Sequence, residues 1–438
     1  WIRPLGPKGA PKAMEELLEE EADHPPIPIP DLKVVEEMQM GIVDGFAEVQ
    51  VAKAQGKPVV FSSVLLPKEI FQAMDVPVVY GNVLGGYVSI FGLSAKYCGI
   101  AEDLGTPRDV CAVHRCTIGV ACADERDDFF NMAFAVPDLA LASNFPCASE
   151  SKSFLAIVER YGIPYHVVDT PISSWNGELP DHAVRYLADQ YRGMVAFLER
   201  HGYKLDEERL REEVAFTKAI NSIFAEIETY RQAIPAPMSA YDSIIAATAP
   251  LVLGKEKRTL AIFEQLRDEL RERVQQGKGV VENERLRLLW IGVPPLCDFK
   301  LVNYSEHRGA VVAKSLVELL AGFMLDPALI DPRQPFESLA RAQLASPINP
   351  PGRGLIDYFV KAARDYKIDG VLAAVKRTCG MLPSIQRLTK DAIQRATGVP
   401  TIIFDLDGVD AREYDAAGTH ATIDAFLDVL LARKERAS

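Results

Sequence analysis

The sequence predicts an α/β protein with two Rossmann/flavodoxin-like parallel-sheet halves, a helical middle segment and an N-terminal helical arm. Short apolar runs alternate with stretches of helical length in two separate regions, which is typical of parallel strands joined by helices. A charged, periodic and strand-poor stretch separates these regions. The length of 438 residues also exceeds what a single hydrophobic core usually serves. We therefore expect parts at residues 1–56, 57–180, 181–284 and 285–438.

The N-terminal arm should contain a short acidic helix at 14–21 and a polyproline segment at 25–30, where repeated prolines remove backbone donors. A longer helix is expected at 31–55, because apolar residues recur there close to every 3.6 positions. The acidic helix and the polyproline segment have little to bury against within two compact halves. We therefore expect them to embrace a homologous subunit.

The remaining elements follow from apolar runs and turn residues. The first half should have strands at 58–61, 76–80, 138–143 and 163–168, with a helix at 67–74. Residues 181–276 are charged, periodic and poor in strand signals, so they should form a helical insertion or linker. The second half should have strands at 286–293, 310–313, 370–374 and 401–404, with helices at 314–324 and 419–433. In such sheets ligands bind outside the carboxyl ends of the strands.

Composition excludes several classes of function. The net charge of -13 argues against nucleic acid as a partner, because phosphates would repel an acidic surface. No apolar run approaches the roughly 20 residues of a membrane span. No signal peptide is visible, so a cytoplasmic location is expected. The sequence lacks GxGxxG and Walker A motifs, which argues against a nucleotide cofactor or ATP hydrolysis in this chain.

Seven cysteines are an odd number for a large chain that is not secreted, which favours free thiols or metal ligands over disulfides. Cys111, Cys147 and Cys379 stand where strands or loops lead into helices. Helix N-termini and the neighbouring cations Arg108 and Arg377 should favour thiolates. Three thiolates without close CxxC spacing suit an iron–sulfur cluster. Buried structural thiols are the alternative.

Longer motifs surround these cysteines. They run Gly105-Thr106-Pro107-Arg108-Asp109-Val110-Cys111, Asn144-Phe145-Pro146-Cys147, Cys379-Gly380, Gly398-Val399-Pro400 and Asp405-Leu406-Asp407. In this order they resemble the cluster-ligand motifs and the last strand of the benzoyl-CoA reductase / 2-hydroxyacyl-CoA dehydratase family. The resemblance extends from about residue 41 to the C-terminus.

The resemblance implies that Cys111, Cys147 and Cys379 bind a [4Fe-4S] cluster with one iron left open. In a double-cubane branch this cluster would be part of an [8Fe-9S] cluster. Cys297 and Cys116 are candidates for extra ligands in that case, against a simple packing role. On a regular helix Cys116 would point away from Cys111.

The resemblance also implies an acyl-CoA substrate, a homologous sister subunit and a separate ATP-hydrolysing iron–sulfur activator. The first hypothesis is an iron–sulfur subunit of a low-potential radical enzyme that reduces an aromatic acyl-CoA of the benzoyl-CoA type. The second is a 2-hydroxyacyl-CoA dehydratase subunit, and a double-cubane reductase of small molecules is a third. An electron-transfer partner and a metal-free α/β protein are the alternatives outside this chemistry.

Three polar residues are candidates for catalysis. Ser63 follows the first predicted strand, with helix capping by the Ser62-Ser63 hydroxyls as the alternative. His114 lies three residues after Cys111 and could donate a proton, with a solvated histidine as the alternative. Glu150 has the same spacing from Cys147. Asp407 and Arg412 are expected to pair structurally rather than to contact substrate.

Overall fold

The computed structural model describes residues 30–172, 179–251, 256–320, 325–349 and 353–437. The helix expected at 14–21 and the polyproline segment at 25–30 lie outside these ranges. At the start of the first described range, helix α2 (Lys33–Ala54) confirms the helix expected at 31–55.

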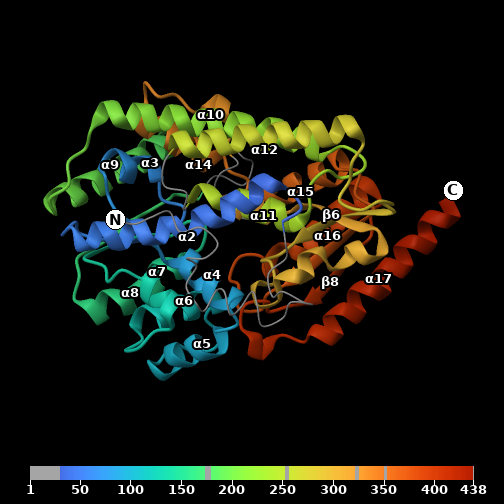
Figure 1. Cartoon of the computed structure of the whole chain (residues 1–438), viewed down its shortest axis with the longest axis horizontal. Coiled ribbons are helices and arrows are strands. Elements are labelled where there is room, and N and C mark those ends of the chain that lie inside the picture. The colour runs from blue at the N-terminus through green and yellow to red at the C-terminus, as the bar shows by residue number, and fades with distance from the viewer. Residues whose placement is uncertain (1–29, 173–178, 252–255, 321–324, 350–352, 438) are drawn as a thin grey trace.

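Two parallel four-stranded sheets form the centre of the molecule (Figure 1), which confirms the predicted α/β class. The first sheet has the order β2-β1-β3-β4 and the second β6-β5-β7-β8. Their strands are β1 (Val60–Ser62), β2 (Val78–Tyr80), β3 (Leu139–Ser143), β4 (Tyr165–Val168), β5 (Leu286–Ile291), β6 (Ala310–Ser315), β7 (Gly370–Val375) and β8 (Thr401–Asp405). Because chain order reverses beside β1 and β5, each sheet has its switch point there.

The boundaries that follow β5 and β6 differ from the prediction. The helix expected to start at Lys314 begins only at Val317, because β6 continues through Ser315 and pairs there with Trp290. Strand β5 ends at Ile291 rather than at residue 293. Gly292 has φ +154°, and a Cβ there would lie 2.7 Å from the Ala374 carbonyl oxygen.

Helices of the first half cover both faces of its sheet. They are α3 (Lys68–Ala73), α4 (Gly81–Ile90), α5 (Ser94–Asp103), α6 (Ala112–Cys122), α7 (Asp128–Ala133) and α8 (Ala148–Tyr161). The second half contains η3 (Leu296–Arg308), α13 (Val317–Leu320), α14 (Pro335–Ala345), α15 (Arg353–Asp365), α16 (Pro383–Thr397) and α17 (Ala416–Ala437). The last of these projects from the body with the C-terminus at its tip (Figure 1).

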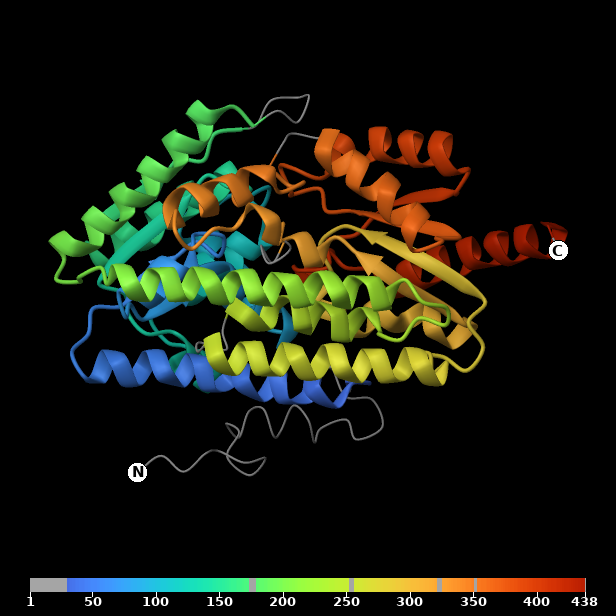
Figure 2. The ribbon, with the colours of Figure 1, turned by 90° about the horizontal axis from the view of Figure 1, so that it is seen from above.

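The middle segment consists of α9 (Asp181–Arg200), α10 (Glu207–Arg231), α11 (Ala240–Thr248) and α12 (Glu256–Gln276). Its helices join the cores of the two halves. Leu210 and Val214 of α10 pack into the core of the first half, whereas Phe224 and Ile227 pack into that of the second. Helices α2, α10 and α12 lie side by side along the molecule (Figure 2). They therefore tie the halves together.

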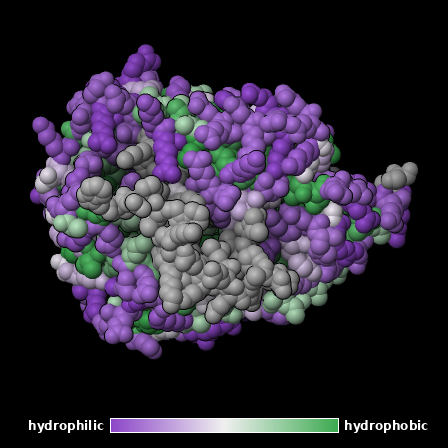
Figure 3. All heavy atoms as spheres, viewed as in Figure 1, coloured by the Kyte–Doolittle hydropathy of each residue, from purple (hydrophilic) through white to green (hydrophobic). Residues whose placement is uncertain are grey.

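Hydrophilic side chains dominate the described part of the face in Figure 3, with small apolar patches between them. Among the described residues, no helix combines the length and apolar character that a membrane crossing requires.

Candidate functional site

Loops at the carboxyl ends of the two sheets contact each other. Leu65 follows β1, Phe145 follows β3 and Met381 follows β7, and these residues pack together with Ile348. Both sheet edges at which ligands are expected therefore border one region.

Cys111 and Cys379 approach this region from different halves. Cys111 is the N-cap residue of α6, and Cys379 lies in the turn between β7 and α16. The Lys376 ammonium lies 3.5 Å from the Cys111 sulfur, and it also interacts electrostatically with Cys379. Since only 3% of Lys376 is exposed, this cation is held between the two thiols rather than in solvent.

The environment of Cys379 is more apolar than the sequence indicated. Burial raises the pKa of its thiol, and Cys111 adds to this effect. Backbone N–H groups of Met381 and Leu382 and the Lys376 charge oppose it without reversing it. The expectation of a lowered pKa is therefore wrong for Cys379, although hydrogen bonds to sulfur also tune cluster ligands.

Cys147 is the N-cap residue of α8, and its sulfur lies 2.8 Å from the Ser149 hydroxyl. It lines a cavity of about 390 Å³ whose walls include Gly380 and Met381. These two residues directly follow Cys379. The third thiol therefore faces the turn that carries the second.

These three half-buried thiols match an iron–sulfur cluster in donor type and in their origin at loop ends. Within the described ranges, no three His, Cys, Asp or Glu side chains form a ready-made metal-binding group. The thiols would have to turn toward one another to share a cluster.

Neither arginine expected beside the cysteines supplies the cation. Arg108 is largely exposed and pairs with Glu413, and Arg377 is exposed. Lys376 takes this role because it directly follows β7 and points inward. The local sequence offered no signal that separates Lys376 from its basic neighbour Arg377, because β7 is buried along nearly its whole length.

Glu150 is buried beside the other two loop ends of the first half. Asn82, in the first turn of α4, donates a hydrogen bond of 2.8 Å to its carboxyl group. Burial raises the pKa of Glu150 to about 8, against the opposing hydrogen bonds from Ser63, Val64 and Asn82. This residue therefore holds a proton at neutral pH. Sequence reasoning did not find Asn82, which carries no motif.

Ser63 does not cap the following helix, so that alternative is wrong. Helix α3 has Pro67 as its N-cap and no side-chain cap. The Ser63 hydroxyl instead accepts a hydrogen bond of 2.9 Å from the Ser143 N–H and contacts Glu150. It therefore links the ends of β1 and β3.

His114 is buried, so the alternative of a solvated histidine is also wrong. Burial, with the nearby Lys376 charge, lowers its pKa to about 4. Its Nδ1 atom has no hydrogen-bond partner within the described structure. His114 is thus a neutral imidazole on the Cys111 helix.

The other cysteines lie deeper or elsewhere. The Cys116 sulfur lies 3.4 Å from that of Cys98, and both residues are fully buried between α5 and α6. Burial raises the pKa of Cys116 well above its usual value. Cys297 is half-buried, and burial and nearby Asp298 and Asp407 raise its pKa to about 12.

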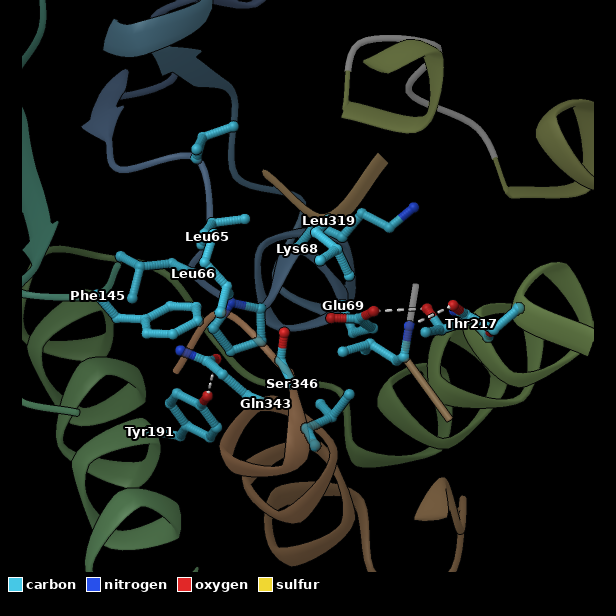
Figure 4. Close-up of a pocket in the computed structure, with 16 residues that line it drawn as sticks. Leu65, Leu66, Lys68, Glu69, Phe145, Tyr191, Thr217, Leu319, Gln343 and Ser346 are labelled. Carbon is cyan, nitrogen blue, oxygen red and sulfur yellow. Dashed lines mark hydrogen bonds between the residues drawn. The ribbon is translucent and has the colours of Figure 1, made fainter. Parts of the chain in front are cut away.

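A second, smaller cavity of about 70 Å³ adjoins the first, with Phe145 and Ile348 in the walls of both. Figure 4 shows its largely apolar lining and the Glu69 carboxyl group facing Thr217. The Tyr191 hydroxyl is hydrogen-bonded to Gln343 at the opposite wall. These four polar side chains are thus engaged in two pairs.

Asp407 and Arg412 do not form the expected pair. Arg412 binds Asp410 at 2.7 Å and Glu102 at 2.6 Å. Asp407 instead accepts a hydrogen bond of 3.2 Å from Thr378, in the Cys379 turn.

Comparison of the sequence with known proteins identifies a family for this chain. The family model described as "2-hydroxyglutaryl-CoA dehydratase, D-component" matches residues 63–430. The α subunit of (R)-phenyllactyl-CoA dehydratase from Clostridium sporogenes is 24% identical, over 88% of this chain and 92% of that subunit. The α subunit of (R)-2-hydroxyisocaproyl-CoA dehydratase from Clostridioides difficile is also 24% identical, over 90% and 95%. One of the subunits of benzoyl-CoA reductase from Thauera aromatica is 24% identical, over 77% and 80%.

The matched region begins directly after β1 and contains the other seven strands and all three cysteines. The chain therefore belongs to the family of the 2-hydroxyglutaryl-CoA dehydratase D-component, whose relatives include dehydratase α subunits and a benzoyl-CoA reductase subunit.

Proposed function

We propose that this chain is the cluster-bearing subunit of an enzyme that acts on an acyl-CoA thioester. The observation that carries the proposal is the approach of Cys111 and Cys379, from different halves, to the buried Lys376. Cys147 faces the same turn from a third loop. Such a set of thiols, two of which follow strands beside the switch points, suits a ligand that joins the halves.

In this proposal Cys111, Cys147 and Cys379 hold a [4Fe-4S] cluster. When bound, the cluster supplies one-electron chemistry at low potential. Lys376 offsets part of the negative charge of the thiolates, which is costly to bury without a partner. Backbone N–H groups of Met381 and Leu382 stabilise the Cys379 sulfur.

The two adjoining cavities give the substrate a place. The larger cavity would take the reacting end of the acyl group beside Cys147, and the smaller one the far end of its side chain. Glu150 could hold a proton near these groups at neutral pH. Exclusion of water by the apolar walls would strengthen electrostatic interactions there.

Dehydration of a 2-hydroxyacyl-CoA is the reaction that the relatives favour, since the family model and two of the named relatives are dehydratases. The smaller cavity, of about 70 Å³, suits a small aliphatic group, because a benzene ring occupies a cavity of about 150 Å³. Reduction of an aromatic acyl-CoA is the second candidate. The benzoyl-CoA reductase relative and the larger cavity, of about 390 Å³, support this second candidate.

Two partners belong to the proposal. The relatives are each named as one subunit of a larger enzyme, which supports a homologous sister subunit. The chain carries no phosphate-binding loop motif. A separate ATP-hydrolysing activator would therefore have to supply electrons at low potential.

The test is an assay of the anaerobically purified chain with its sister subunit, activator, ATP and a strong reductant. We expect turnover of 2-hydroxyacyl-CoA in preference to benzoyl-CoA, and loss of turnover in Cys147→Ser but not in Cys122→Ser. Preference for benzoyl-CoA would support the second candidate. Sustained turnover with reduced nicotinamide cofactor alone, without activator, would contradict the electron source.

A further inference from the structure

The loop that follows β8 enters the first half of the molecule. Val409 belongs to the second half in the sequence, but its side chain is fully buried in the core of the first half. The Ser89 hydroxyl donates a hydrogen bond of 2.7 Å to the Val409 carbonyl. The Ala411 N–H donates one of 3.1 Å to the Ser94 hydroxyl. Specific contacts therefore hold this loop, residues 406–413, against the first half, and we call it the docking loop.

A buried ion network fixes the docking loop. Arg115 of α6 donates hydrogen bonds to Asp410 at 2.8 Å and to Glu102 at 2.6 Å. Only 1% of the Arg115 side chain and none of the Asp410 side chain is exposed. Arg412 binds both carboxylates from the other side. Two cations thus balance two anions, and removal of one member would leave a buried charge uncompensated.

The same network reaches the loop that carries Cys111. The Arg115 side chain donates a hydrogen bond of 2.9 Å from Nε to the Val110 carbonyl. Its backbone N–H donates another of 2.9 Å to the Cys111 carbonyl. The Arg115 side chain therefore joins the Val110 carbonyl, next to Cys111, to the ion network, while the bond to the Cys111 carbonyl is the first backbone bond of α6.

On its other side the docking loop holds the Cys379 turn. Asp407 accepts hydrogen bonds from the backbone N–H groups of Val409 and Asp410, at 3.1 and 3.3 Å. It also accepts the Thr378 hydroxyl at 3.2 Å, and the Lys376 ammonium lies 4.0 Å away. One short loop thus contacts both cysteine-bearing segments.

We propose that Arg115 and Asp410 are positioning residues, which hold Cys111 against the Lys376–Cys379 turn so that thiols from the two halves can share one ligand. The inference rests on the proposed function for the identity of that ligand. The approach of the two thiols is a property of the chain itself. It can therefore be measured without a cluster.

The test is the yield of cross-linking between Cys111 and Cys379 by a short bifunctional thiol reagent in the full-length, metal-free chain. Peptide mapping by mass spectrometry identifies the bridged pair. We expect Asp410→Asn to lower the yield by roughly tenfold, because the effective concentration of two held groups depends steeply on their geometry. An unchanged yield in folded Asp410→Asn would overturn the proposal.

Two further variants keep the test decisive. Thr378→Val removes only the hydrogen bond between the Cys379 turn and Asp407, so it should lower the yield even if Asp410→Asn fails to fold. Glu284→Gln removes a carboxylate from the equally buried Arg287 pair, which contacts neither cysteine segment. It should lose stability and keep the cross-link. An equal loss of cross-linking in Glu284→Gln, or none in Thr378→Val, would refute the positioning role.

The proposed function fails separately. If anaerobically purified wild-type protein holds no iron, the cluster assignment is wrong. The cross-linking result still decides whether the docking loop positions the two thiols.

Discussion

Lys376 is the residue on which the electrostatics of the site depend. Its buried ammonium lies between Cys111, Cys379 and Asp407. A buried cation requires polar or charged neighbours, which here are the Asp407 carboxylate and the sulfur atoms of Cys111 and Cys379. Lys376 therefore prepares the site for negative charge before any ligand binds.

Replacement of Lys376 by Met should raise the pKa of Cys379 further, because the cation opposes the effect of burial on this thiol. Alkylation of Cys379 at pH 8 in metal-free protein should slow by roughly threefold to tenfold. Mass spectrometry of the labelled peptide measures the rate. The control is Arg377→Met, which removes the exposed neighbouring cation and should change the rate little. Equal rates in both variants would argue against the role of Lys376.

Glu150 makes stability depend on pH. Its pKa of about 8 in the folded chain lies above the unfolded value of about 4.3. The stability that comes from the protonated form is fully present below the unfolded value and is lost as pH rises toward 8. As pH rises across this window, the free energy of unfolding of Glu150→Gln should therefore increase relative to that of wild type, by at most about 1.4 kcal/mol per pH unit.

Urea unfolding at several pH values measures this difference. Glu159→Gln, at an exposed position of the same helix, should show no pH-dependent difference in stability from wild type. A difference between wild type and Glu150→Gln that stays constant from pH 5 to pH 8 would show that Glu150 is ionised throughout.

At the scale of elements, the ends of strands bring the site together. The apolar runs predicted the strands well, because the buried faces of parallel strands leave little choice of residue. The end of β6 was missed because Lys314 and Ser315 read as polar, whereas Lys314 is buried in ion pairs with Glu228 and Glu318. Glu318 is only four residues from Lys314, but Glu228 is 86 residues away, and a pair at that separation leaves no local pattern.

Gly292 ends β5 where a side chain would collide with β7. Gly292→Ala should lower the free energy of unfolding by roughly 1–3 kcal/mol, because the backbone there suits only glycine. Gly99→Ala is the control, since its Cβ would meet no atom within 4 Å and it lies within α5. The free energy of unfolding of Gly99→Ala should rise by up to about 1 kcal/mol. Similar stabilities of the two variants in denaturant titrations would contradict this explanation.

At the scale of the molecule, the function proposed depends on two halves that meet at their loop ends. The sequence predicted that Cys147 and Cys379 follow strands and that Cys111 starts a helix, because motif order survives when identity is low. It did not identify Lys376, Asn82 or the docking loop. Their roles come from contacts between residues far apart in the chain, which are 68 positions apart for Asn82 and Glu150 and 295 for Arg115 and Asp410.

The central claim is that Cys111, Cys147 and Cys379 share one cluster. The most direct test counts iron and acid-labile sulfide in anaerobically purified wild-type chain and in its Cys→Ser variants. We predict about four of each per wild-type chain. Replacement of any one of the three cysteines should cause a marked loss, and Cys122→Ser, at a buried position of α6, should cause none. Retention of full iron content in all three variants, or a wild-type chain without iron, would contradict the account.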